Sequence, residues 1–156
     1  MLKEVPAHLE NSMQLIETVQ EKDQSFNKHL PYLFSLDVVS LYTFISVNEA
    51  IGDITNKINT NLNGLTRNDI QNFPSTILRN MYFQFNSTIY QQIEGLPIGS
   101  SLSGILAVLF MDRLERKTLT RHQPHIEPYK HYVDHIYMQT TDESQFLGGL
   151  GVNRKH

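Results

Sequence analysis

Cysteine and tryptophan are both missing from this chain of 156 residues. Without thiols, the chain can form neither a disulfide framework nor a thiolate zinc site. Long apolar runs are missing too, since the longest, GILAVLF at 104–110, is far too short to cross a bilayer. No apolar segment follows the first lysine, so the start does not resemble a signal peptide. These absences predict an intracellular protein, nuclear or cytoplasmic, with no membrane partner.

An excess of positive charge is also absent. Thirteen Lys and Arg residues stand against sixteen Asp and Glu residues, which gives a net charge of −3. Proteins that bind nucleic acid on their own are normally basic, so a nucleic-acid function has to be reconciled with this balance. The hydrophobic content of 40% and charged content of 19% are typical of a globular domain.

Apolar spacing predicts alternating short strands and helices. A Ser46–Glu49 capping box is expected at the start of one helix, and Pro74 is expected either to kink another or to lie in its first turn. Asp112 and Glu115 are expected on the solvated face of a later helix. The predicted elements are helices over 8–20, 46–58, 67–80 and a buried 102–119, a buried strand within 31–42, hairpins over 81–93 and 131–139, and a glycine-rich turn over 94–101.

Two aspartates stand at the predicted strand ends. Asp37 ends the apolar run of 31–42, and Asp134 occupies the tip of the hairpin HYVDHIY at 131–137. If the two strands are neighbours, both carboxylates emerge at one edge of the sheet, where hard oxygen ligands can hold Mg²⁺ for phosphoryl or nucleotidyl transfer. The alternative is ordinary turn chemistry, which often uses aspartate.

Three segments in order resemble the palm motifs of reverse transcriptases: LFSLDVVSLYTFISVNEAI at 33–51, EGLPIGSSLSGILAVLFMDRLE at 94–115 and YVDHIY at 132–137. The wording is most similar to that of Penelope-like retroelements, which have motifs near DVVSLYTNIP and YVDD. YFQFNSTIYQQIEG at 82–95 and HLENSMQLIETV at 8–19 are also similar to that family. The resemblance covers about residues 8–140.

The resemblance implies an α+β fold, with a polymerase palm-like antiparallel sheet backed by helices, incomplete fingers and no thumb. It divides the chain into a helical N-terminal segment left from the fingers (1–30), the palm (31–147) and a disordered tail (148–156). The implied function is RNA-templated DNA synthesis by two-metal nucleotidyl transfer. The implied cofactor is Mg²⁺, as two ions, and the implied partners are an RNA template, a DNA primer and a deoxynucleoside triphosphate.

The resemblance also implies roles for individual residues. Asp37 and Asp134 would be the catalytic metal ligands, with the Val38 carbonyl as a backbone ligand. The remaining positions would bind the nucleotide: Ser40 and Leu41 through backbone amides, Tyr42 as the steric filter that excludes a 2′-hydroxyl, and Ile98 with Gly99 where the backbone approaches the base. Tyr42 could equally be a core aromatic, and Gly99 a simple turn glycine.

Departures from the family pattern accompany the matches. His135 stands where the family has a second aspartate, and a neutral imidazole is a poor ligand for Mg²⁺. Phe44, Ser46, Ser101 and Gly104 also replace family residues, so the metal site is expected to be weakened.

Two alternatives to an active enzyme remain open. The chain could be an inactive remnant or domesticated fragment that binds nucleic acid or protein. It could also be an unrelated RRM-like RNA-binding module, which would stack bases on exposed sheet aromatics.

His122, His125 and His131 could form a transition-metal cluster. Pro124 and Pro128 favour a surface loop there instead.

Overall fold

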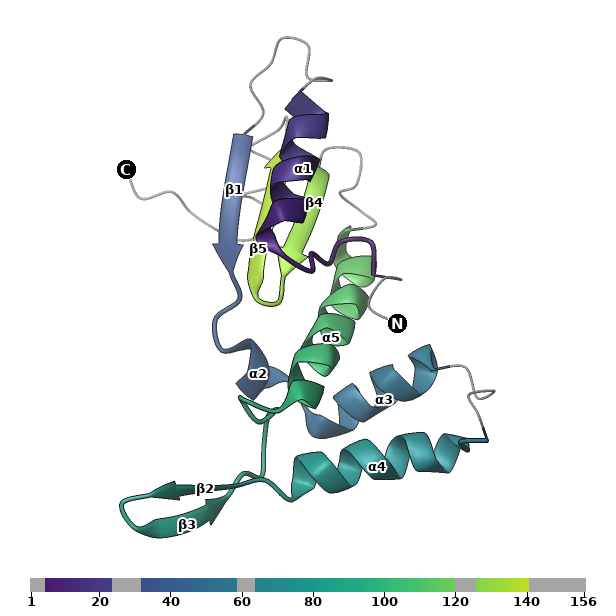
Figure 1. The fold of residues 1–156 in the computed structure, drawn as a ribbon, viewed down its shortest axis with the longest axis vertical. Coiled ribbons are helices and arrows are strands. Elements are labelled where there is room, and N and C mark those ends of the chain that lie inside the picture. Colours follow the sequence, from purple (N-terminus) through teal and green to yellow (C-terminus); the bar gives the residue numbers. More distant parts are fainter. Residues whose placement is uncertain (1–4, 24–31, 59–63, 120–125, 141–156) are drawn as a thin grey trace. The chain divides into compact units, whose positions relative to one another are not determined.

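The structure, a computed structural model, describes residues 5–23, 32–58, 64–119 and 126–140. Two compact units make up the chain: a sheet unit, Ala7–Val38 with Arg116–His156, and a helical unit, Met1–Pro6 with Val39–Glu115. The elements (Figure 1) are α1 (Ser12–Asp23), β1 (Tyr32–Asp37), α2 (Leu41–Phe44), α3 (Val47–Lys57), α4 (Arg67–Arg79), β2 (Tyr82–Phe85), β3 (Thr88–Gln91), α5 (Ser101–Leu119), β4 (Ile126–Tyr132) and β5 (His135–Thr140).

The sheet unit contains a three-stranded antiparallel sheet in the order β1-β5-β4. β4 and β5 are joined by a two-residue turn at Val133 and Asp134, since Tyr132 already pairs with His135. A tight hairpin needs positive φ, and Val133 adopts φ 53°, a strained conformation for a β-branched residue. Helix α1 packs against β4 (Figure 1), so the predicted antiparallel sheet backed by a helix is confirmed.

β1 is more exposed than predicted. It ends at Asp37, as the sequence indicates, but Tyr32 and Leu33 are 46% and 60% exposed. The predicted strand ending near Asp37 is therefore confirmed, and the prediction that it is buried is wrong. The physical reason is the position of β1 at the edge of the sheet, where it pairs on one side only, with β5.

The segment before α1 pairs with the sheet and is not helical. Leu9 donates its backbone N–H to the carbonyl of His131 at 2.8 Å, and His131 donates to the carbonyl of Ala7 at 2.8 Å. These bonds form a parallel bridge between His8 and His131. The predicted helix over 8–20 thus begins only at Ser12, because residues 7–9 extend along β4 instead.

Helices α3 and α4 each contribute one apolar stripe to the core of the helical unit. α3 and α4 pack together, with Ala50 and Ile54 buried on the first and Ile70 and Leu78 on the second. Spacings of four and eight residues place each pair on one face of its helix. Other buried apolar residues of this unit are Val5, Leu41, Ile45, Leu96, Leu106, Ala107, Val108, Leu109 and Met111.

Helix α4 is capped in a way that the sequence analysis missed. The Thr66 hydroxyl accepts the backbone N–H of Asp69 at 3.2 Å, and the Asp69 carboxylate accepts the backbone N–H of Thr66 at 2.8 Å. This reciprocal pair is a capping box in which aspartate replaces the usual glutamate. Pro74 lies inside α4 and is buried, so it is not in the first turn.

The capping box predicted for α3 is absent. Ser46 is the N-cap residue, but its side chain makes no capping hydrogen bond. Glu49 instead lies 3.4 Å from Arg113, which also pairs with Asp53 at 2.8 Å. The carboxylate of Glu49 is thus directed toward a cation on α5 and away from the end of its own helix.

The polar side chains of α5 also differ from the prediction. Asp112 and Glu115 are only 8% and 6% exposed, so the expectation of a solvated face is wrong. Asp112 accepts a hydrogen bond from the Lys57 ammonium at 3.1 Å, which offsets the cost of burying its charge.

None of the helices in the described part of the chain is long and apolar enough to span a membrane.

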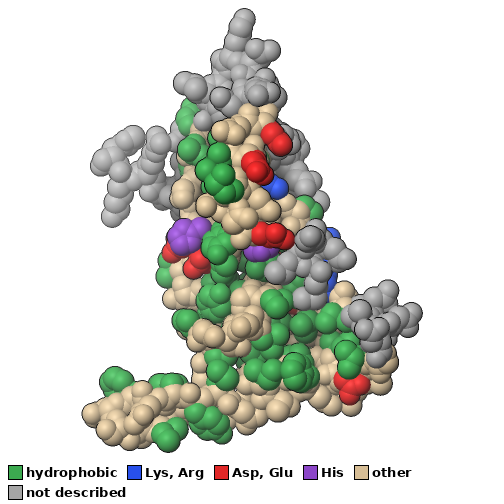
Figure 2. All heavy atoms as spheres, viewed as in Figure 1, with side chains coloured by type: hydrophobic (Ala, Val, Ile, Leu, Met, Phe, Trp, Pro, Cys, Tyr) green, Lys and Arg blue, Asp and Glu red, His purple; other side chains and the backbone are tan. Residues whose placement is uncertain are grey.

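The hairpin of β2 and β3 is confirmed, with Asn86 and Ser87 at φ 47° and 62° in its turn. Positive φ at both central residues matches the right-handed twist of the strands. All of its strand residues are exposed, and no charged residue occurs in 81–93. Figure 2 accordingly shows only hydrophobic and uncharged polar side chains on the visible face of this hairpin.

Gly95 fixes the turn before α5. It has φ 75°, and a Cβ built there would lie 2.9 Å from the Thr43 Cα and 3.0 Å from the Tyr42 carbonyl oxygen. Leu96 donates its backbone N–H to the same Tyr42 carbonyl at 2.7 Å. Glycine is therefore needed for close backbone approach, and it ties the 94–99 turn to α2.

Replacing Thr66 with alanine is expected to lower the free energy of unfolding by about 1 kcal/mol, because the Asp69 N–H loses its acceptor. Chemical denaturation measures the change. Thr76→Ala is the matched control, since the Thr76 hydroxyl only donates back to the Asn72 carbonyl inside the same helix. Equal losses in the two variants would contradict the capping role.

The effect of this cap should depend on pH. Hydrogen bonds from the Thr66 side chain and backbone lower the pKa of Asp69. A lowered folded-state pKa stabilises the protein above the ordinary aspartate pKa, and this contribution is lost as pH falls through the folded value. The difference between wild type and Thr66→Ala should shrink over that acidic range. A difference that stays constant with pH would show that the carboxylate takes no part.

Gly95→Ala is expected to destabilise the protein more than Gly99→Ala does. Both positions have positive φ, so both variants incur the left-handed strain of about 1–2 kcal/mol. Only at Gly95 does the added methyl meet backbone atoms, which adds roughly 1–3 kcal/mol of overpacking. Equal midpoints in chemical denaturation would contradict the close approach at Gly95.

Candidate metal centre

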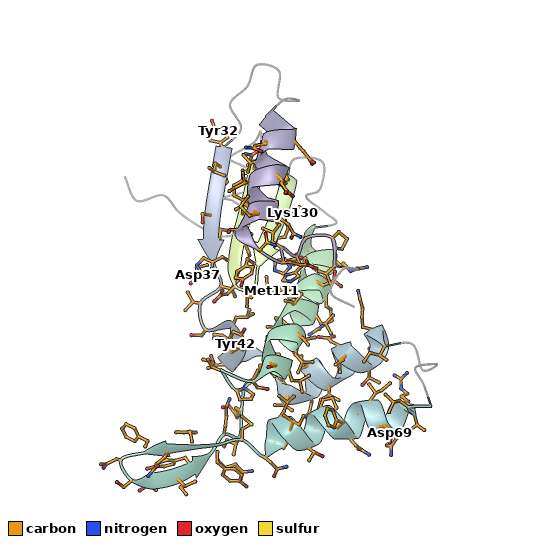
Figure 3. All side chains as sticks on the ribbon, in the orientation of Figure 1. Tyr32, Asp37, Tyr42, Asp69, Met111 and Lys130 are labelled. Carbon is orange, nitrogen blue, oxygen red and sulfur yellow. The ribbon has the colours of Figure 1, made fainter. Side chains whose placement is uncertain are left out.

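The centre lies where β1 ends beside the β4–β5 turn. Pairing of β1 with β5 sets Asp37 opposite His135, and the turn places Asp134 next to that pair. Val38 continues the alignment, because its backbone N–H donates to the Asp134 carbonyl at 2.9 Å. Asp37 is labelled at this end of β1 in Figure 3. All four residues belong to the sheet unit.

The three side chains form one cluster. His135 Nδ1 lies 3.0 Å from an oxygen of Asp134, and His135 Nε2 lies 3.6 Å from an oxygen of Asp37. One ligand atom from each residue lies within 4.8 Å of the other two. Among the residues that the structure describes, this is the single group of three such side chains placed to share a metal ion.

The cluster is open to solvent. The exposed fractions of the side chains are 69% for His135, 56% for Asp37 and 38% for Asp134. Figure 2 shows red carboxylates beside a purple imidazole at the surface of this unit. An ion could enter directly from water, and water could fill the positions that the protein leaves free.

The donor atoms decide which ions fit. Two carboxylates suit a hard divalent cation, but the third donor is an imidazole nitrogen, which suits transition metals. The cluster therefore offers two oxygen donors and one nitrogen donor to a divalent cation.

The predicted nucleotide-binding residues belong to the helical unit, and the structure groups them. Ser40 adopts φ 58° and opens α2, where its carbonyl accepts the backbone N–H of Thr43 at 3.1 Å. The Leu41 side chain is buried in the core, while Tyr42 is half-buried (Figure 3). This half-burial is compatible with both interpretations of Tyr42, as a steric filter and as a core aromatic.

Ile98 and Gly99 lie on the turn that Gly95 holds against α2. The Ile98 side chain is 81% exposed, and Gly99 has φ 95° with open space where a Cβ would be. A ligand could therefore approach the backbone at Gly99 without a steric barrier. The roles of all these residues toward a nucleotide stay predictions.

Two features were missed in the sequence. The first is the constrained turn at Gly95, which the sequence Glu-Gly-Leu-Pro after a hairpin already indicates. The second is a pair of histidines: His131 is fully buried, and its ring lies 5.4 Å from that of His8. Burial lowers the pKa of His8. His122 and His125 of the proposed transition-metal cluster lie outside the described residues.

Sequence comparisons find no relative for this chain. No model of a known protein family matches it, and no curated protein shows significant similarity.

Solved structures do resemble it. Telomerase from Candida albicans, in complex with the TWJ fragment of telomeric RNA, superposes with a TM-score of 0.75 at 12% identity over 96% of this chain. Apo telomerase from Candida tropicalis, truncated from its C-terminal domain, gives 0.66 at 18% identity over 93%. The chain spans only 29% and 31% of those two chains. It therefore has a reverse transcriptase-like α+β fold, resembling part of the telomerase chain.

Proposed function

We propose that this chain is the palm portion of a reverse transcriptase-type polymerase from the Penelope-like lineage of retroelements. RNA would be the template, DNA the primer, a deoxynucleoside triphosphate the substrate and Mg²⁺, as two weakly held ions, the cofactor. The observation that supports this most is the register of β1 on β5. That register sets Asp37 beside the turn that carries Asp134, in a fold that resembles telomerase.

Asp37 and Asp134 would hold the cation in this proposal. A divalent cation bound there supplies charge neutralisation to phosphate oxygens during nucleotidyl transfer. The edge position of β1 leaves the Asp37 carboxylate accessible to a substrate from the solvent side. By the family resemblance Val38 would contribute its carbonyl, and the bond from its N–H to the Asp134 carbonyl holds Val38 beside the turn.

Tyr42, Ser40, Leu41, Ile98 and Gly99 would contact the nucleotide. Support for this part comes from their grouping, since the Leu96 N–H to Tyr42 carbonyl bond joins the two segments that carry them. Open space at Gly99 also allows a base to approach the backbone. The steric role of Tyr42 against a 2′-hydroxyl follows from the family resemblance.

An inactive palm that binds nucleic acid or protein is the second candidate. The imidazole of His135 favours it, because this nitrogen donor contacts both carboxylates. The uncharged aromatic surface of the β2–β3 hairpin also suits binding without chemistry.

Cation binding is the first test of the proposed site. Mn²⁺ titrated into the protein, followed by electron paramagnetic resonance, should bind with an affinity that falls at least about tenfold in Asp37→Asn, because a direct ligand is lost. Glu17→Gln, which removes one exposed carboxylate from α1 of the same unit, is the control and should bind normally. Unchanged binding in Asp37→Asn would refute the site.

A primer-extension assay tests whether residues 1–156 are active on their own. In a primer-extension assay on an RNA template, residues 1–156 are expected to give no product with Mg²⁺, either as wild type or as His135→Asp. Phosphoryl transfer depends on electrostatic stabilisation by groups around the triphosphate, and the cluster at the end of β1 offers carboxylates and an imidazole only. Extension by wild type that disappears in Asp37→Asn would establish an active enzyme and eliminate the inactive palm.

A further inference from the structure

The imidazole of His135 has an arrangement typical of a metal-binding histidine. Its Nδ1 lies 3.0 Å from Asp134, and an ionised carboxylate can only accept a hydrogen bond. In the neutral ring, the tautomer that makes this contact a hydrogen bond carries its proton on Nδ1. Nε2 is left with its lone pair free to coordinate a cation.

Nε2 faces the other carboxylate at a suitable distance. It lies 3.6 Å from an oxygen of Asp37. Two donors that each lie about 2.1 Å from one ion in tetrahedral geometry are separated by about 3.4 Å. The two atoms are thus spaced as ligands on neighbouring corners of one coordination shell, and solvent can supply the remaining corners.

The role of Asp134 changes in this geometry. In protein metal sites, a ligating histidine commonly donates its other ring N–H to a carboxylate, which fixes the tautomer and raises the basicity of the ligand. Asp134 holds that position toward His135 through one oxygen.

We propose that this cluster is a transition-metal site, selective for Zn²⁺-like ions over Mg²⁺, in which His135 Nε2 and Asp37 are the direct ligands and Asp134 orients the imidazole. The inference rests on the proposed cation site and assigns it a different ion class. Imidazole nitrogen prefers zinc, nickel, copper and iron, whereas Mg²⁺ takes oxygen donors and loses water reluctantly.

Competition titrations test the selectivity. Zn²⁺ and Mg²⁺ are each titrated against Mn²⁺ bound to the full chain, with Mn²⁺ release read by electron paramagnetic resonance. Zn²⁺ is expected to displace Mn²⁺ at concentrations at least tenfold lower than Mg²⁺ does. His135→Gln should reduce the Zn²⁺ affinity at least about tenfold and leave the Mg²⁺ affinity within about threefold. His135→Asp should reverse the preference toward Mg²⁺.

Seven histidines in the chain make unrelated zinc binding a concern. Only the binding that is lost in both His135→Gln and Asp37→Asn counts toward this site, and Glu17→Gln must retain it. Asp37 and His135 are exposed, so circular dichroism should show unchanged melting in these variants.

The outcomes separate the inference from the proposed function. If Mn²⁺ binding depends on Asp37 but Mg²⁺ competes as well as Zn²⁺, the transition-metal assignment is overturned while the cation site stands. If Zn²⁺ binds equally well in wild type and His135→Gln, the assignment is also overturned, since the metal then binds elsewhere. If no cation binds in an Asp37-dependent manner, both proposals fail.

Discussion

The antiparallel register between β1 and β5 determines the candidate metal centre. With Asp37 opposite His135, and Tyr132 also paired with His135, the two-residue turn delivers Asp134 to the end of β1. A shift of one residue in either pairing would turn the side chains to the other face of the sheet. The bond from the Val38 N–H to the Asp134 carbonyl continues this alignment one residue beyond the strand. The strained φ of Val133 is consistent with a turn that the surrounding sheet imposes.

The donor atoms of the cluster determine which ion it can bind. Two carboxylates beside the end of β1 suit a divalent cation in many kinds of protein. We propose nucleotidyl transfer as the reaction that such a cation would support, and we propose that the imidazole of His135 changes the ion that the cluster prefers. Under both proposals the position of the site is kept while the chemistry that Mg²⁺ supports is lost.

The sequence predicted the fold class, the order of the elements and the two acidic strand ends. These features depend on local apolar spacing and turn residues, as in the Asn86–Ser87 hairpin. Prediction from the sequence failed where contacts between distant segments determine burial and strand position. Asp112 carries a charge that hydrophobic periodicity assigns to solvent, but Lys57, 55 residues away, pairs with it in the interior. β1 has an apolar sequence typical of a central strand and lies at an edge, which only the pairing order reveals. The distance between His135 and Asp37 likewise depends on register. The sequence therefore indicated the two aspartates as metal ligands, but it gave neither the geometry of the cluster nor the part that His135 takes in it.

The central claim is that one ion is held jointly by His135 and Asp37. A crystal of the protein grown with Zn²⁺ and measured at the zinc absorption edge tests it most directly. The account predicts an anomalous peak about 2.0–2.2 Å from His135 Nε2 and from an Asp37 oxygen, with Asp134 still bonded to Nδ1. A peak held by Asp37 and Asp134 with the imidazole turned away, or zinc found only at other histidines, would contradict it.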